Sequence, residues 1–441
     1  MIARRYPALM QQPPGSGGAV ERWAASGAMA LTGLPDQPLG PPAGLVEGME
    51  RLGARFTGLD ALALLGERAA HMALWRRGAV SCGGSCRLLP CADGWIAVSL
   101  PRAEDMELVP AWRELETNGG TGMLTPPATW EAVGRTLAGC SAAEVSGLLR
   151  RARLLGLPVA AVGEAQGAGE TEADDGDGPL APGVVRTVLG DALARPVNGL
   201  RIVDLSALWA GPLCGDLLAG VGADVMKVES WARPDGARRG PAPFFDLLNG
   251  RKRSVALDLR SKEEQGVLLR LIRQSDVVIE ASRPRALAQM GMDACRLLTA
   301  AAEGAGPQIW ISITGFGRTH DDGQRVAFGD DAAAAAGLVV WHEDLSGSTG
   351  RATPLFCADA VADPLTGLAA AGACLDALER GERCLLDVSM AGVCASLAGP
   401  TLTAGPDVVV ADPRARQSAG RAPALGADTD AVLAELSARE R

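Results

Sequence analysis

Short apolar runs alternate with amphipathic stretches through the second half of the chain. The runs LRIVDL, DVMKVE, SVALDL, DVVIEA and IWISIT lie between residues 200 and 314 and are rich in aliphatic and β-branched residues. A stretch with helical periodicity, KEEQGVLLRLIRQ, separates two of them. This order of strand, glycine-bearing turn, helix and strand is typical of an open parallel sheet. We therefore predict a Rossmann-like α/β domain, in which ligands bind beyond the carboxyl ends of the strands.

The first half of the chain predicts a smaller α/β domain. Residues 57–80 carry an apolar stripe at helical spacing, and CADGWIAVSL indicates a strand pair around a turn at Asp93-Gly94. Residues 128–158 then predict two helices, with Ser141 as the N-cap of the second. At the far end, residues 427–441 predict one exposed helix.

An acidic, glycine-rich stretch that begins at Gly163, GEAQGAGETEADDGDGPLAPG, separates these two halves. It has almost nothing to bury, so we expect a flexible linker. The predicted organisation is a flexible tail over 1–20, a small-domain-like region over 21–165, a linker over 166–196, the Rossmann-like domain over 197–400, and a tail with a C-terminal helix over 401–441.

Charge and cysteine content narrow the class of protein. The 441 residues carry a formal net charge of -10, which argues against nucleic acid as the main partner. No apolar run reaches the roughly 18 residues of a membrane span. The 10 cysteines are too few for a disulfide scaffold, so we expect reduced thiols in the cytoplasm. Cys82, Cys86 and Cys91 lie close together but lack the CxxC spacing of a zinc site, so we expect no metal.

The glycines of GPLCGDLLAG do not fall as GxGxxG, which disfavours a nicotinamide enzyme. Four ordered motifs favour another assignment: LWAGPLCGDLLAGVGADVMKVE, NGRKRSVALDL, DVVIEASRPRAL and ITGFG. Together they resemble the family III CoA-transferases, the group that includes formyl-CoA and carnitine CoA-transferases and the α-methylacyl-CoA racemases. The resemblance implies the family III fold, coenzyme A as a co-substrate bound across these loops, and an acyl-CoA and a carboxylic acid as reactants.

The resemblance also implies which residues bind coenzyme A. Its phosphates need cations and backbone N–H donors, and basic residues fall at the predicted loop positions. The expected CoA-binding residues are Ala210, Lys227, Asn249, Arg251, Lys252, Arg253, Arg283, Arg285, Gly315 and Gly317.

A carboxylate nucleophile is expected after the GFG exit, in AFGDDAAAAAGLVVW. Asp331 matches the family aspartate when counted from Gly329, whereas counting back from Gly337 leaves Asp330 as a competitor. An aspartate with an ordinary pKa near 3.9 is ionised at pH 7 and needs no partner base to attack a thioester. An aspartyl-CoA intermediate would then pass CoA to the acceptor acid. An aspartate at this position is also a good helix cap.

The order of the segments is rearranged relative to the family. WAASGAMALTG, CADGWIAVSL and LLGLPVAAVGE resemble elements that the family carries behind the catalytic aspartate, yet they stand in front here. The layout is permuted or partly duplicated, and a homodimer is expected from the family. Two alternatives remain: a non-catalytic protein that binds CoA or acyl-CoA, and an acyl-CoA racemase, which would need a second acid/base such as His320.

Overall fold

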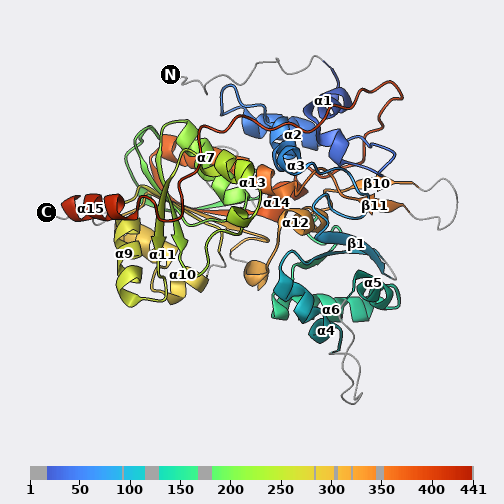
Figure 1. Cartoon of the computed structure of the whole chain (residues 1–441), viewed down its shortest axis with the longest axis horizontal. Helices are drawn as coiled ribbons and strands as arrows, with labels where there is room; N and C mark the ends of the chain where they lie inside the picture. The colour runs from blue at the N-terminus through green and yellow to red at the C-terminus, as the bar shows by residue number, and fades with distance from the viewer. Residues whose placement is uncertain are drawn as a thin grey trace.

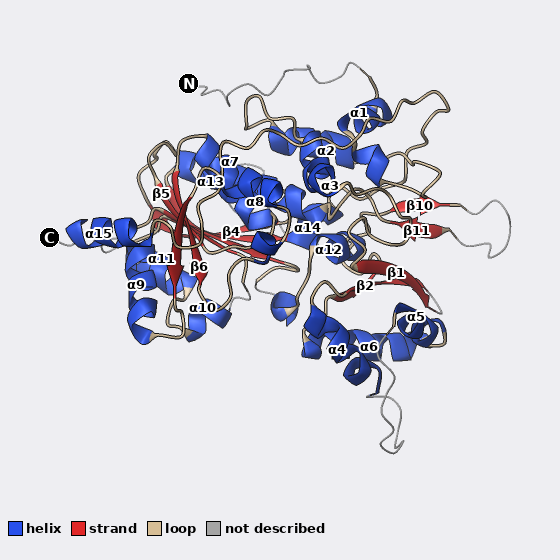
Figure 2. Ribbon diagram, viewed as in Figure 1, coloured by secondary structure: helices blue, strands red, loops and turns tan. Residues whose placement is uncertain are grey.

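A computed structural model describes residues 17–91, 94–114, 129–166, 181–282, 285–301, 306–318, 321–343 and 352–439. A large α/β unit and a smaller unit of three strands and three helices lie side by side, and a helical N-terminal segment covers one side of both (Figure 1). Strands of the large unit form one twisted sheet, whereas the smaller unit has its own curved sheet (Figure 2).

The large sheet has seven strands in the order β4-β12-β9-β8-β5-β6-β7. Its six parallel members confirm the Rossmann-like prediction, because the chain runs outward from β5 to β7 on one side and from β8 to β12 on the other. The strands span Val184–Asp191 (β4), Arg201–Asp204 (β5), Asp224–Ser230 (β6), Arg253–Leu257 (β7), Val277–Glu280 (β8), Ile309–Thr314 (β9) and Glu382–Ser389 (β12).

Successive side chains of each strand serve two separate cores. In β9, Ile309 and Ile311 face the core beneath α7 and α13, whereas Trp310 faces the opposite core. Both faces are therefore apolar, which explains why these strands are continuous apolar runs in the sequence. The first face is covered by α7 (Ala210–Gly220), α8 (Ala242–Asn249) and α13 (Ala362–Arg380), and the second by α9 (Lys262–Arg273), α11 (Ala294–Ala301) and α15 (Thr429–Arg439).

Two predictions about the ends of this unit differ from the structure. Strand β4 lies inside the predicted linker of residues 166–196, and it pairs antiparallel with β12 at the edge of the large sheet. Residues 167–180 of that linker lie outside the described ranges. The terminal helix is present as α15, but it is not simply exposed, because Val432 and Leu436 are buried in the second core.

The smaller unit is an antiparallel sheet, β1 (Cys86–Cys91), β2 (Gly94–Ser99) and β3 (Val159–Ala161), backed by helices. The predicted strand pair is confirmed, with Cys91 opposite Gly94. Of the predicted turn residues, Gly94 is the first residue of β2, and Asp93 lies outside the described residues. Its helices are α4 (Ala103–Glu114), α5 (Trp130–Ala138) and α6 (Ala142–Leu155). Ser141 caps α6 as predicted, and Glu144 completes a capping box by accepting from the Ser141 backbone N–H at 2.7 Å.

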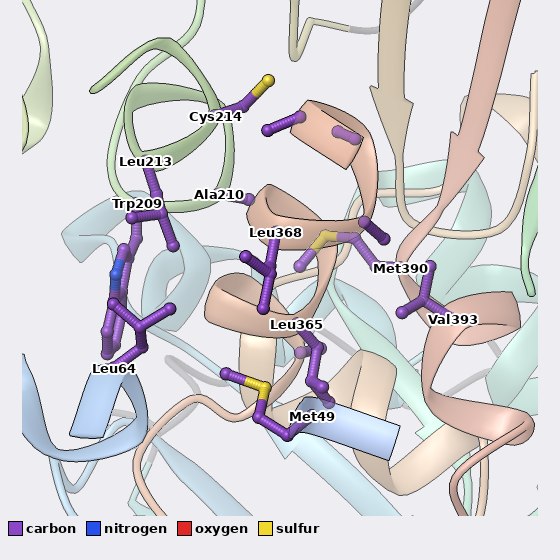
Figure 3. Close-up of a cluster of buried hydrophobic side chains, with 14 of the residues drawn as sticks. Met49, Leu64, Trp209, Ala210, Leu213, Cys214, Leu365, Leu368, Met390 and Val393 are labelled. Atoms are coloured by element: carbon purple, nitrogen blue, oxygen red, sulfur yellow. The ribbon is translucent and has the colours of Figure 1, made fainter. Parts of the chain in front are cut away.

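The N-terminal segment carries α1 (Ala19–Ser26), α2 (Leu45–Gly53), η1 (Ala28–Leu31), η2 (Leu62–Gly66) and α3 (Glu67–Met72). The stripe predicted as helical over 57–80 thus forms only two short helices. Figure 3 shows Leu64 of η2 beside Trp209, and Met49 of α2 beside Leu365 of α13. These side chains belong to the same core as the first face of the large sheet. The two halves of the chain therefore share one hydrophobic core.

The C-terminal tail returns along this N-terminal segment, where a buried charge network ties three regions together. Arg416 of the tail donates to Glu67 of α3 at 2.7 Å and to Asp216 of α7 at 2.6 Å. Both carboxylates are fully buried, and Arg251 donates to the other oxygen of Asp216 at 2.8 Å. Burial raises the pKa of Glu67 although Arg416 opposes that shift. The Arg416 guanidinium offsets the free-energy cost of burying these two carboxylates.

We predict that Arg416→Ala will destabilise the protein by about 3–5 kcal/mol, because it leaves buried carboxylates without their partner. Urea denaturation will measure the loss. The control is Arg414→Ala on the same tail, whose partner Asp60 is 46% exposed. A surface pair of this kind contributes at most about 1 kcal/mol. Equal losses in the two variants would contradict the assigned role of Arg416.

Candidate active site

The two candidate aspartates open the short helix α12 (Gly329–Ala335), which lies between the small sheet and the large unit. The helix is buried along its whole length. Backbone N–H groups of Gly163 and Ala165, just beyond β3, donate to the carbonyls of Ala334 and Ala335 at 2.9 and 2.8 Å. Only methyl side chains allow main chains to approach so closely from several sides. The alanine run thus serves the packing of this helix.

Asp331 is held as a helix cap. Its Oδ1 accepts from the backbone N–H of Phe328 at 2.9 Å, and the side chain is almost fully buried. Its Oδ2 has no hydrogen-bond partner among the described residues. Burial raises the pKa of Asp331 well above its ordinary value, although the Phe328 N–H opposes the shift. Burial therefore disfavours the carboxylate form of Asp331, which is the form that a nucleophile needs.

Asp330 faces a more polar environment. Its Oδ1 accepts from the backbone N–H of Ala360 at 3.1 Å, and Ser81 donates a further hydrogen bond. Burial and the neighbouring Asp359 carboxylate raise the pKa of Asp330 to about 6, while Arg68 opposes this rise. Asp330 is thus mostly ionised at neutral pH.

Arg68 of α3 brings a cation to this place. Its Nε and Nη2 donate to the two oxygens of Asp359 at 2.8 and 2.6 Å. Its guanidinium lies 5.5 Å from the ring centre of Trp209, the residue before α7. The side chain keeps 28% of its surface exposed, whereas Asp359 is fully buried. A guanidinium that contacts a carboxylate through two hydrogen bonds and an aromatic ring as well has a fixed orientation.

A third carboxylate, Asp363, joins the group from the first turn of α13. It accepts a hydrogen bond from the backbone N–H of Ala210, at the start of α7. Burial raises the pKa of Asp363 to about 7, with the Arg68 charge opposing the shift and Asp330 adding to it. A side chain at Gly329 would collide with Asp363, so glycine there lets the two helix starts meet. Ala210 is thus part of the carboxylate site, as a backbone donor.

The switch point of the large sheet lies between the carboxyl ends of β5 and β8. Leu208, in the loop after β5, is 40% exposed and has φ of 69°, a left-handed conformation that is rare for leucine. Its backbone N–H donates to Asp235 at 3.0 Å, which joins it to the loop after β6. Strained backbone of this kind is concentrated at functional sites.

Most of the predicted phosphate-binding cations have carboxylate partners inside the protein. Lys227 is buried in β6 and pairs with Asp235, and Lys252 pairs with Asp204. Arg253 is the first residue of β7, at the amino edge of the sheet. It pairs there with Asp224 and Glu435, whereas Arg251 pairs with Asp216 in the tail network.

The remaining predicted residues divide into structural and accessible positions. Asn249 is buried and donates to the Phe245 carbonyl at 3.1 Å. Gly315 lies against Ala327 too closely for a side chain, and Gly317 has φ of 91°, so both glycines are required by the backbone. Arg285 opens α10 (Arg285–Gln289) beyond β8 and is exposed. Arg283 and His320 lie outside the described residues.

Sequence reasoning did not single out four residues that the structure places near these features. Arg68 and Asp363 join the carboxylate site, and Arg233 and Arg239 are exposed in the loop after β6. No side-chain partner of Arg233 or Arg239 occurs among the described residues. For Arg68 the sequence holds no signal, because its neighbours are distant in the chain. Asp363 lies in the first turn of α13, and the sequence does show it as a short polar residue in front of an apolar helix.

Within the described ranges, no three His, Cys, Asp or Glu side chains gather as metal ligands. None of the helices described is both long and apolar enough to cross a bilayer.

The chain is similar to several known proteins over part of its length. It is 30% identical over 217 residues to the succinate–glutarate CoA-transferase of Agrobacterium fabrum, covering 45% of this chain and 52% of that protein. It is 34% identical over 151 residues to the succinyl-CoA–D-citramalate CoA-transferase of Chloroflexus aurantiacus, covering 33% and 37%. The chain thus spans about half or less of the length of these relatives.

A solved structure of a CAIB/BAIF family protein from Brucella suis matches 46% of this chain and 55% of its own, with 30% identity and a TM-score of 0.38. The model of CoA-transferase family III matches residues 197–428. That match takes in the large sheet from β5 onward, both candidate aspartates and Asp363, and it extends over more than half of the chain. The chain therefore belongs to CoA-transferase family III.

Proposed function

We propose that the protein transfers coenzyme A from an acyl-CoA thioester to a carboxylic acid, with Asp330 as the covalent nucleophile. The observation that carries this proposal is the contrast between the two aspartates. Asp330 has polar donors, a nearby guanidinium and a pKa of about 6, whereas Asp331 is a buried cap with a strongly raised pKa. Family membership supplies the reaction class.

The reaction balances with one carboxylate and no net proton transfer. An oxygen of Asp330 attacks the thioester carbonyl, and the C–S bond breaks to give an acyl-aspartyl anhydride and CoA thiolate. The thiolate attacks the Asp330 carbonyl, which releases the first acid and leaves aspartyl-CoA. The acceptor carboxylate attacks this thioester to form a second anhydride, and the released thiolate attacks the acceptor carbonyl. The products are the new acyl-CoA and the free Asp330 carboxylate.

We propose that coenzyme A lies across the switch point of the large sheet. The exposed side chains of Arg233, Arg239 and Arg285 are suited to its phosphates, since each is accessible in the segment that follows the carboxyl end of a strand. The names of the relatives favour short dicarboxylic acids as reactants. Five of the residues expected to bind phosphate already have a hydrogen-bond or ion-pair partner within the protein, so we propose that they shape this region and do not contact phosphate. They are Lys227, Asn249, Arg251, Lys252 and Arg253.

The protein is further proposed to act as a cytoplasmic homodimer. Its ten cysteines are all free thiols, nine of them at least partly buried, which suits a reducing compartment. The dimer rests on the resemblance to the family.

Asp330→Asn is predicted to lower CoA transfer by at least about a thousandfold, because an amide cannot form the anhydride. Asp331→Asn is the matched control, since the amide oxygen can still accept from the Phe328 N–H. It should retain activity within several-fold. Incubation with succinyl-CoA, trapping with hydroxylamine and peptide mass spectrometry will locate the adduct. A mark on Asp331 that persists in Asp330→Asn would overturn the assignment.

We also expect kcat/KM for CoA transfer to fall as the pH drops below about 6. The carboxylate form of Asp330 is the nucleophile, and its pKa is raised to about 6 by burial and Asp359, so protonation removes activity on the acid side. A pH–rate profile between pH 4.5 and 8, a range chosen to span roughly two units around that pKa, will measure this limb. An acid limb near the ordinary aspartate value of about 4 would contradict the assigned environment.

A further inference from the structure

Arg68 reaches the carboxylate site from a part of the chain that lies outside the matched family region of residues 197–428. It comes from the short helix α3, whose first residue, Glu67, is anchored by Arg416. Burial alone would lower the pKa of Arg68, but the carboxylates of Asp359, Asp330 and Asp363 together raise it. The guanidinium is therefore permanently charged within this group of acids.

The loop before α13 is shaped around this cation. Ala358 and Ala360, on either side of Asp359, have φ of 55° and 46°, a left-handed conformation that alanine seldom adopts. This backbone presents Asp359 to Arg68 and, at the same time, the N–H of Ala360 to Asp330. The Ala358 N–H is held by the hydroxyl of Thr32 at 3.0 Å. One strained turn thus fixes the guanidinium and the nucleophile relative to each other.

Few groups around Asp330 carry charge. The titratable neighbours are Asp359, Asp363, Asp331, Arg68, Cys82 and Cys86, contributed by the loop before α13, α13, α12, α3 and the segment from residue 81 into β1. Both thiols have a raised pKa because they are buried, so they stay neutral. Arg68 is the cation with the largest effect on Asp330, Arg325 acts on the adjacent Asp331, and carboxyl groups outnumber these cations.

We infer that Arg68 is a positioning residue that acts through Asp330: its charge keeps the nucleophile ionised, and Asp359 holds that charge in place. The inference deepens the proposed function and rests on it for the role of Asp330. It assigns a purpose to the N-terminal segment, which supplies the balancing charge of the site. Asp359 has a double effect, because it orients Arg68 and also adds a negative charge near Asp330.

The test is the titration of Asp330 in protein labelled with ¹³C at the aspartate carboxyl carbon, with the Asp330 signal assigned by its loss in Asp330→Asn. Removing a nearby opposite charge raises a carboxyl pKa by about 1–3 units. Arg68→Gln is therefore expected to raise the titration midpoint by at least about one unit. Arg68→Lys should restore most of it. Asp359→Asn should shift the midpoint downward, since it removes a like charge.

Arg22→Gln is the matched control, because Arg22 is a half-buried arginine of the same segment that pairs with Glu47 and Glu50 and does not act on Asp330. Its midpoint should equal that of the wild type. The acid limb of kcat/KM should move with the midpoint in each variant. If Arg68→Gln does not fold, the double variant Arg68→Gln/Asp359→Asn, which removes both members of the buried pair, is compared with Asp359→Asn, and its midpoint should be higher by about one unit. An unmoved midpoint in a folded Arg68→Gln, or equal midpoints in Asp359→Asn and the double variant, overturns the inference.

The titration needs no substrate, so it separates the two ideas. Midpoint shifts in a protein without CoA-transfer activity would refute the proposed function and uphold the electrostatic role of Arg68. Transfer activity with an unmoved midpoint would support the proposed function and refute the electrostatic role of Arg68.

Discussion

The docking of α12 against the small sheet is the constraint on which the rest of the site depends. Because only alanine methyl groups separate this helix from its neighbours, its carbonyls accept hydrogen bonds from residues beyond β3 in the other half of the chain. That contact fixes where the helix begins, and so fixes Asp330 and Asp331. Asp331 then caps the start of the helix by accepting from Phe328, and Asp330 accepts from Ala360 just before α13, where the charge of Arg68 acts on it. Two adjacent residues of identical chemistry thus acquire different electrostatic surroundings.

Burial of charge governs how the basic residues are used. A charged group removed from water needs a partner, and the large unit pairs Lys227, Lys252 and Arg251 with aspartates in its interior. These cations stabilise the loops that follow the strands. The exposed arginines in the segments beyond the strands are the ones we propose for phosphate binding. A position near a glycine-rich loop in the sequence does not distinguish a cation that forms an internal ion pair from one that is accessible to a phosphate.

The two ends of the chain pack against each other and against the large unit. The N-terminal segment and the C-terminal tail lie side by side, joined by a pairing of Pro42 with Thr401 and by the Arg416 network (Figure 1). Side chains from both halves fill one core (Figure 3). Packing depends on which surfaces meet, and the connection between them can be cut and rejoined elsewhere when the ends are close in space.

The sequence by itself determined the parallel sheet, the small strand pair, the cap at Ser141 and the location of the candidate nucleophile within two residues. These follow from local periodicity, turn chemistry and ordered motifs, which are legible in one dimension. The sequence did not reveal β4, because the glycine and alanine residues around it are typical of a linker. Its pairing with β12, which the sequence does not show, is what makes it a strand. Nor did the sequence show that the surroundings of Asp330 and Asp331 differ, or that Arg68 lies near Asp330. Only the tertiary structure decided these surroundings, because a carboxyl pKa depends on burial and on charges that come from distant parts of the chain.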